Sequence, residues 1–216
     1  MGGIVDQLRN RLTILIKYDI IDENNRKVMK MRLWTFQPER VYEILQRDGV
    51  FRCDPSLSEC ITECEFAQAY DWMVEQMKNR IGDPPDGVKV PIWAWHTHDW
   101  KHKKPDLRLG EFWYSSPMLC IEIELPDEQV LLCDEEEWHY VLNNWYLSED
   151  EQESERIDAL SEEKQEKIKP FSWKKIFDAR PIDNGWTRRG CYVQATFWEL
   201  KKEMVVSVRK VKAKMR

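Results

Sequence analysis

Three histidines close together in the chain carry the clearest metal-binding chemistry. His96 and His98 are two positions apart, so they would point to the same side of a β-strand, and His102 follows. Imidazoles, together with carboxylates such as those of Asp99 and Asp106, are typical zinc ligands. The simpler interpretation is a polar strand end that continues into a solvated loop. We therefore assign no metal ligand from the sequence.

A cationic segment, Lys-Lys-Pro-Asp-Leu-Arg at residues 103–108, follows the histidines. Its Arg108 carries a planar guanidinium that can bind a phosphate or a carboxylate through two parallel hydrogen bonds. The same arginine could instead pair with Asp106 and hold the loop in place. The sequence leaves both interpretations open.

Two pairs of alternating residues could also contribute to a site. Glu122 and Glu124 would share one face of a strand, where two carboxylates could perform acid–base chemistry. Solvated glutamates on the outer face of a half-buried strand explain this pattern more simply. Trp93 and Trp95 would share a strand face as well. We expect them in the core rather than as stacking platforms for bases.

Several catalytic classes have no signature in this chain. No serine or cysteine lies in a nucleophile elbow, and the eight glycines form no phosphate-binding loop. The six cysteines are scattered without Cys-x-x-Cys spacing, which favours reduced thiols. No apolar run approaches the roughly 20 residues of a membrane span. We therefore expect a cytoplasmic protein with no membrane partner.

The charges are unevenly distributed along the chain, and tryptophan is unusually frequent. The net charge is −6, with dense acid at residues 149–166, whereas residues 201–216 are mostly basic. A basic tail of this kind could contact the phosphates of a nucleic acid, although it is more often a solvated chain end. Eleven tryptophans in 216 residues is a high proportion. Most should be in the core, and the excess is a weak indication of a ligand groove.

The segment at residues 31–54 predicts a strand, a helix and a second strand. Residues 33–37 are rich in aromatic and β-branched side chains, as in a strand. Pro38 suits the first turn of a helix, and Gly49 suits its end. An extended pattern resumes at residues 50–53.

Short apolar strands alternate with periodic helices along the rest of the chain, which predicts an α+β domain with a mixed β-sheet. We expect residues 33–37, 92–97, 119–125 and 192–199 in one sheet. Helices at 65–81 and 135–147 should pack on it.

The predicted organisation is a single domain with additions. Residues 1–30 are expected to be an N-terminal extension, and residues 31–211 the domain itself. Within the domain, 149–169 reads as an exposed, acidic helical insertion. Residues 212–216 form a basic tail.

Six segments of the chain form a specific set of motifs. They are LWTFQPERVYEIL (33–45), YDWMVEQM (70–77), PIWAW (91–95), KKPDLR (103–108), WHYVLNNWYL (138–147) and QATFWEL (194–200). Together they resemble a bacterial and phage family, domain of unknown function 3841. The resemblance covers roughly residues 31–211 and implies no particular activity.

A fainter resemblance is to the ADP-ribosyltransferase fold. It rests on the strand, glycine-ended helix and strand at residues 31–54, and on the Gln-Ala-x-Φ pattern at 194–197. The resemblance implies that the first strand offers a polar or aromatic residue to NAD near the nicotinamide. On this sequence Trp34, Thr35 or Gln37 would do so.

The late strand of that fold carries a catalytic glutamate, which stabilises an oxocarbenium-like ribose. Here Thr196 occupies the position of that glutamate, within Gln194-Ala195-Thr196. Glu199 lies three residues further on, and an odd step along a strand points to the opposite face. The resemblance thus implies Gln194, Thr196 and Glu199 as catalytic candidates, with the expected carboxylate displaced.

Three hypotheses about function follow. The first is an ADP-ribosyltransferase-like domain that binds NAD or a related nucleotide, with Trp34 or Gln37 beside Gln194 and with Arg108 on a phosphate. The alternative is a non-catalytic module that binds nucleic acid or a protein through its tryptophans and basic tail. A third is a metal-dependent hydrolase that uses the histidines.

Overall fold

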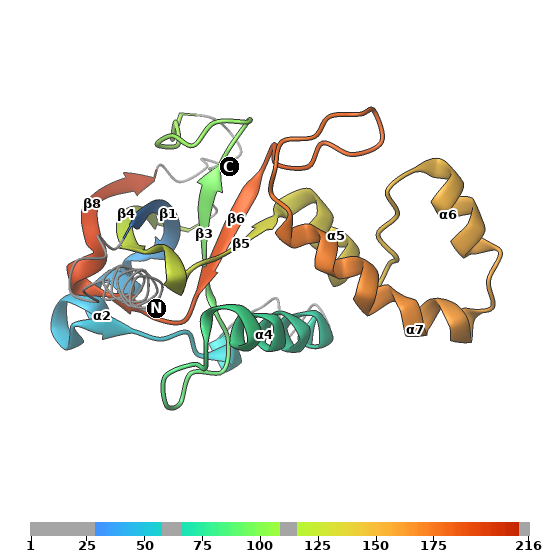
Figure 1. Ribbon diagram of the computed structural model, residues 1–216. Helices are drawn as coiled ribbons and strands as arrows, with labels where there is room; N and C mark the ends of the chain where they lie inside the picture. The colour runs from blue at the N-terminus through green and yellow to red at the C-terminus, as the bar shows by residue number, and fades with distance from the viewer. Residues whose placement is uncertain (1–28, 58–65, 109–115, 212–216) are drawn as a thin grey trace, which may run out of the picture.

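A six-stranded sheet forms the centre of the molecule, in the order β5-β6-β3-β1-β4-β8 (Figure 1). The computed structural model describes residues 29–57, 66–108 and 116–211. The strands are β1 (Lys30–Pro38), β3 (Ile92–Thr97), β4 (Met118–Pro126), β5 (Leu131–Asp134), β6 (Val193–Phe197) and β8 (Val205–Val211).

The four strands predicted from the sequence lie together in this sheet, which confirms the α+β single-domain prediction. Every strand pair among the described residues is antiparallel, so the sheet is not mixed as we expected. The reason is topological. Strand β1 is flanked by β3 and β4, both antiparallel to it, and α2 and α4 do not act as crossovers between parallel neighbours.

The predicted strand–helix–strand unit is confirmed. Helix α2 (Glu39–Asp48) begins directly after Pro38, and Gly49 ends it in the left-handed conformation, at φ 79°. The N–H of Gly49 donates to the carbonyl of Leu45 at 3.0 Å. Strand β2 (Val50–Phe51) then pairs with β7 (Leu200–Lys201) in a separate two-stranded sheet.

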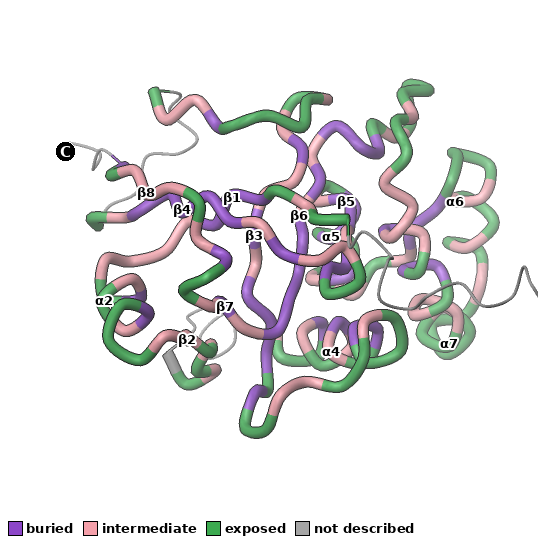
Figure 2. Tube along the Cα trace, turned by 60° about the vertical axis from the view of Figure 1, so that its left-hand side comes forward, coloured by how far each residue is buried: buried purple, intermediate pink, exposed green. Residues whose placement is uncertain are grey.

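Each face of the main sheet has its own hydrophobic core. On one face, Leu45 and Tyr42 of α2 pack against side chains such as Leu33 and Ile121. The second core, towards the β5–β6 end, is covered by α4 (Ala67–Ile81), α5 (Glu135–Leu142) and the 3₁₀ helix η5 (Trp173–Phe177). The buried stretches follow β3 and β6 in Figure 2. Both predicted helices therefore pack as expected.

Helix α5 ends five residues earlier than predicted. We expected it to reach residue 147 because Trp145 continues the spacing of Trp138 and Val141. Asn144 adopts φ 53°, which breaks the helix, and Trp145 is 57% exposed. Asn can adopt the left-handed conformation at low cost, and the sequence pattern alone does not show that it does so here.

Two short helices occupy the segment predicted as an acidic insertion. They are α6 (Glu151–Asp158), in which no residue is buried, and α7 (Glu162–Ser172), which leads into the buried η5. The predicted N-terminal extension (apart from residues 29 and 30) and the basic tail at 212–216 lie outside the described residues. Across the described ranges, no helix is long and apolar enough to span a membrane.

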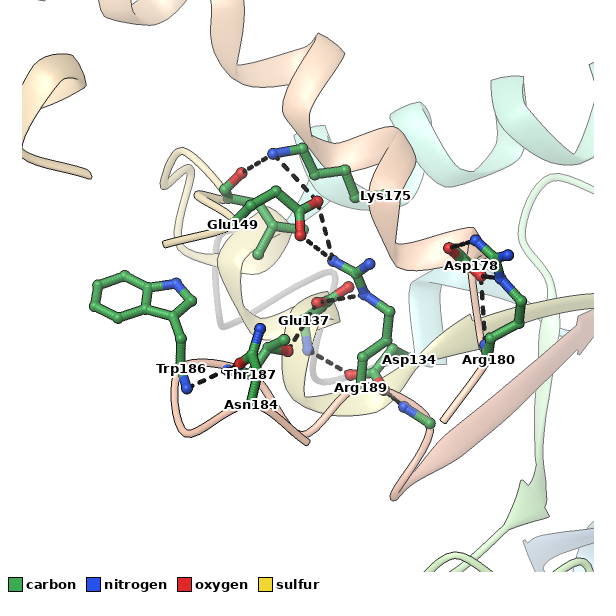
Figure 3. A network of polar contacts seen from close by, with 12 residues as sticks. Asp134, Glu137, Glu149, Lys175, Asp178, Arg180, Asn184, Trp186, Thr187 and Arg189 are labelled. Atoms are coloured by element: carbon green, nitrogen blue, oxygen red, sulfur yellow. Dashed lines mark hydrogen bonds and ion pairs between the residues drawn. The ribbon is translucent and has the colours of Figure 1, made fainter. Parts of the chain in front are cut away.

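A buried ionic network joins the start of α5 to the loop at residues 178–190 (Figure 3). Arg189 Nε donates to Glu137 Oε1 at 2.8 Å, and both side chains are buried. A second Arg189 nitrogen lies 3.3 Å from Glu149. Asp134 caps α5 by accepting from the Glu137 N–H at 2.9 Å, and it also accepts from the Gly190 N–H at 2.6 Å.

Removing Glu137 should be strongly destabilising because Arg189 would keep its buried charge without its closest partner. We expect Glu137→Ala to lower the free energy of unfolding by about 3–5 kcal/mol, measured by urea denaturation. The control is Glu163→Ala, whose exposed ion pair with Lys167 should contribute no more than about 1 kcal/mol. Equal losses in the two variants would contradict a structural role for the network.

Candidate functional site

One row of side chains crosses all six strands on the same face of the sheet. Residues paired across neighbouring strands project to the same side, so the register identifies the row. Trp34 is opposite Trp95 on β3 and opposite Glu122 on β4. Continuing outwards in both directions, the cross-strand row consists of Cys133, Gln194, Trp95, Trp34, Glu122 and Ser207.

The centre of the cross-strand row combines two indole rings with a partly exposed amide. Trp34 is buried, and its indole Nε1 has no hydrogen-bond partner among the described residues. Trp95 is half-buried, with its ring centroid 5.9 Å from that of His98. Gln194 is half-buried too, and its amide makes no hydrogen bond within the described ranges. A half-buried amide without a protein partner is a natural contact for a polar ligand.

The loop that follows β3 lies against this row. His102 packs on Trp34, with ring centroids 5.3 Å apart, and its Nδ1 lies 2.8 Å from the carbonyl oxygen of His96. The His96 and His102 rings are 4.1 Å apart. Burial, with a further contribution from His102, lowers the pKa of His96 to about 4, so His96 is neutral at pH 7. Leu107 then packs beside Trp34.

Glu122 is buried in a charged cluster under the same loop. Its Oε2 accepts from Lys104 Nζ at 2.8 Å and from Ser207 Oγ at 2.7 Å, and Arg32 lies 3.5 Å from its Oε1. Burial alone would raise the pKa of Glu122, but the hydrogen bonds from Lys104 and Ser207 outweigh it and lower that pKa. The interpretation of Glu122 as a solvated glutamate was therefore wrong. The alternating pattern in the sequence predicted a polar face of the strand. It could not show that the loop carrying Lys104 covers this face.

Thr196 lies on the predicted face but does not face a cleft. Its side chain is 0% exposed, and its Oγ1 lies 3.3 Å from the carbonyl oxygen of Leu131. Its cross-strand partner Trp93 packs on Trp138 in the second core. Because the helices cover this end of the sheet, Thr196 acts as a packed core residue.

Glu199 lies in a different environment from Gln194. It comes after the end of β6, where Arg52 and Lys201 each approach its carboxylate to 3.0 Å. Although burial opposes it, these two partners lower the pKa of Glu199. Together with Asp83 it lines a cavity of about 220 Å³. The carboxylate is thus not presented to the cross-strand row.

The two remaining predicted residues, Gln37 and Arg108, are not part of the cross-strand row. Gln37 is on the opposite face of β1, and its amide donates to Thr35 Oγ1 at 2.8 Å. Arg108 is 89% exposed and pairs with Asp106 at 2.6 Å, which lowers the pKa of Asp106 to about 2. The row thus brings together Trp34 and Gln194 among the predicted residues. It joins them through Trp95, which the sequence analysis assigned to the core.

The three histidines do not converge on one point. His96 and His102 are adjacent, whereas the ring of His98 contacts Trp95 and Tyr192. In the part of the chain that the structure describes, no three His, Cys, Asp or Glu side chains are placed to hold a metal ion.

The sheet and its row define an α+β protein in which polar and aromatic side chains line up on one face of an antiparallel sheet. Residues 32–169 match the family described as domain of unknown function (DUF3841). The match covers more than half of the chain, and the chain belongs to this family. It ends before β6, so Gln194 and Ser207 lie outside the matched residues. Comparison with curated proteins and with solved structures gives no match.

The buried His96 should make stability depend on pH. Its pKa is about 4 in the folded state and 6.5 ordinarily, so between these values the unfolded chain binds a proton that the folded chain does not. Stability should therefore fall as the pH falls below 6.5. Allowing for partial exposure, we expect a loss of about 1–2 kcal/mol at pH 5 relative to pH 7.5, measured by urea denaturation.

The His96→Gln variant should lose less stability than the wild type over the same pH range. The matched control is His139→Gln, because His139 is an exposed histidine on α5. A His96→Gln variant with the same pH dependence as the wild type would show that His96 is not the responsible group.

Proposed function

We propose that NAD or a related nucleotide binds at the half-buried part of the cross-strand row, against Trp95 and Gln194, with the buried Trp34 next to them in the row. The observation that carries this proposal is the half-buried Gln194 amide, which has no described partner and lies in register with two tryptophans. An amide can donate to and accept from the carboxamide of nicotinamide or the edge of a base. The partly exposed indole of Trp95 provides apolar surface for stacking.

The proposal draws on the faint resemblance of the sequence to ADP-ribosyltransferases. In that fold the first strand and a late strand both contribute to the NAD site. Here β1 and β6 are separated by β3 alone, so Trp34 and Gln194 lie on either side of Trp95 in one row.

An exposed cation, Arg108, directly follows Leu107, which packs beside Trp34. Lys104 is already paired with Glu122. Arg108 uses its Nε and one terminal nitrogen on Asp106, and the other terminal nitrogen has no described partner. We assign Arg108 to a phosphate of the nucleotide, because its exposed guanidinium keeps donors for that contact.

The proposed function is binding, and we assign no transfer step to it. Transfer of ADP-ribose needs a carboxylate beside the developing positive charge on the ribose. Position 196 holds a buried threonine, and Glu199 is held by Arg52 and Lys201. The carboxylate within the row, Glu122, is already paired with Lys104.

A nucleic-acid site on the basic C-terminal segment has less support. Lys201 pairs with Glu199, Lys202 donates to a backbone carbonyl, and Lys210 pairs with Glu39. Arg209 donates to the carbonyl of Pro105. The described cations of this segment are thus used within the molecule.

Gln194→Ala should weaken nucleotide binding while leaving the fold intact. We expect the affinity for NAD or ADP-ribose, measured by isothermal titration, to fall by about 5- to 30-fold, because a hydrogen-bonded polar contact is lost. Gln37→Ala is the matched control, because Gln37 is on the opposite face of the same sheet.

Two outcomes would overturn this proposal. One is the absence of NAD and ADP-ribose binding by the wild type at millimolar concentration. The other is unfolding of the Gln194→Ala variant, seen by circular dichroism, which would make Gln194 a structural amide.

A further inference from the structure

A separate pocket of about 260 Å³ lies between α5 and the loop at residues 183–188. Its lining includes Glu136, Glu137 and Tyr140 from the helix, and Asp183 and Trp186 from the loop. Pockets for drug-sized ligands span roughly 300–1,000 Å³, so this one suits a single side chain or ring.

The pocket is acidic, because Glu136 and Asp183 form no ion pair with a described residue, whereas Arg189 neutralises Glu137. Glu136, Glu137 and Asp183 contribute three carboxylates. Glu137 is buried, and while its Oε1 pairs with Arg189, its Oε2 has no hydrogen-bond partner among the described residues. Arg188 also lines the pocket, but its guanidinium is engaged elsewhere: it donates to the Sγ of Cys191 and lies over the ring of Trp100. A cationic ligand would balance these carboxylates.

The aromatic wall of the pocket is held in place. Trp186 is 44% exposed, and its indole N–H donates to the carbonyl of Ser148 at 3.1 Å. The side chain of Asn184 accepts from the backbone N–H groups of Trp186 and Thr187, which fixes the loop (Figure 3). A fixed, half-exposed indole beside carboxylates favours guanidinium, which stacks on aromatic rings and donates several hydrogen bonds.

The surface around the pocket resembles a protein interface. Tyr140 and Trp145 are exposed, with ring centroids 6.1 Å apart. Tyr140 also lines a second pocket of about 260 Å³, formed with α6 and α7. Exposed aromatic side chains are enriched at interfaces, and the acidic segment at 149–166 complements a basic partner.

We propose that this surface docks a partner protein through one of the partner's arginines. The guanidinium lies in the pocket between Glu136, Asp183 and the ring of Trp186. Residues of the partner next to that arginine cover Tyr140 and Trp145. This proposal is independent of nucleotide binding at the cross-strand row.

Two small probes test the pocket in isothermal titrations with the full chain. They are N-acetyl-arginine amide and N-acetyl-citrulline amide, which have nearly the same shape but differ in charge. The arginine probe should bind, and the citrulline probe should bind at least ~10-fold more weakly. Raising the salt from about 50 to 500 mM should weaken the arginine probe. Equal binding of the two probes, or no binding of either, would overturn the proposal.

Exposed substitutions locate the binding without disturbing the buried network. Glu136→Gln, Asp183→Asn and Trp186→Leu should each weaken the arginine probe at least ~3-fold, with melting temperatures within about 2 °C of the wild type. Glu163→Gln on α7 is the matched control, because it removes an exposed acid outside the pocket. An equal effect of Glu163→Gln would mean that the probe responds only to overall charge.

A peptide probe tests whether the guanidinium that binds in the pocket belongs to a partner protein. N-acetyl-Leu-Arg-Leu amide should bind at least ~3-fold more tightly than N-acetyl-arginine amide, because its leucines add apolar contact. Trp145→Ala should remove that gain. If the peptide binds no better than the single residue, the pocket serves a small guanidinium compound and the docking proposal fails.

Discussion

The pairing of β1 with β4 is the constraint on which the two faces of the sheet depend. It runs over the whole of β1, from Lys30 opposite Pro126 to Pro38 opposite Met118. A shift by one residue would exchange the faces, so that Leu33 would leave the core under α2 and Trp34 would turn towards it. The long register therefore fixes the composition of the cross-strand row.

The two faces of the sheet differ in the polar groups that they bury. The face under α2 is almost wholly apolar, and a polar residue there, such as Thr35, bonds to nearby protein atoms. The other face buries charge under a loop, where Lys104 neutralises Glu122. Such a pair is costly to desolvate unless every partner is in place, so this loop has a narrow range of positions over the row. Towards β6 the same face presents the half-buried Trp95 and Gln194.

Local signals in the sequence predicted most of the fold. Pro38 and Gly49 bounded α2 because each acts on its own part of the backbone. Alternation also placed Gln194 on the same face as Thr196, but it could not show that distant helices bury the threonine. The meeting of Trp34 with Trp95 depends on a register between strands far apart in the chain. For that reason the sequence analysis identified Trp34 and Gln194 as site residues but did not identify Trp95, which lies between them.

The Asp134 side chain links helix α5 to the loop at residues 178–190. The same carboxylate caps α5 and holds the Gly190 N–H, and Asp134 directly follows Cys133 of the row. Gly190 has φ 82°, and a side chain there would meet the carbonyl oxygen of Ala179 at 2.9 Å, so this contact admits no bulkier residue. Local unfolding of the first turn of α5 therefore also breaks the hydrogen bond that holds the loop at residues 178–190. In hydrogen exchange the amides of Glu137 and Gly190 would therefore open together, as one cooperative unit.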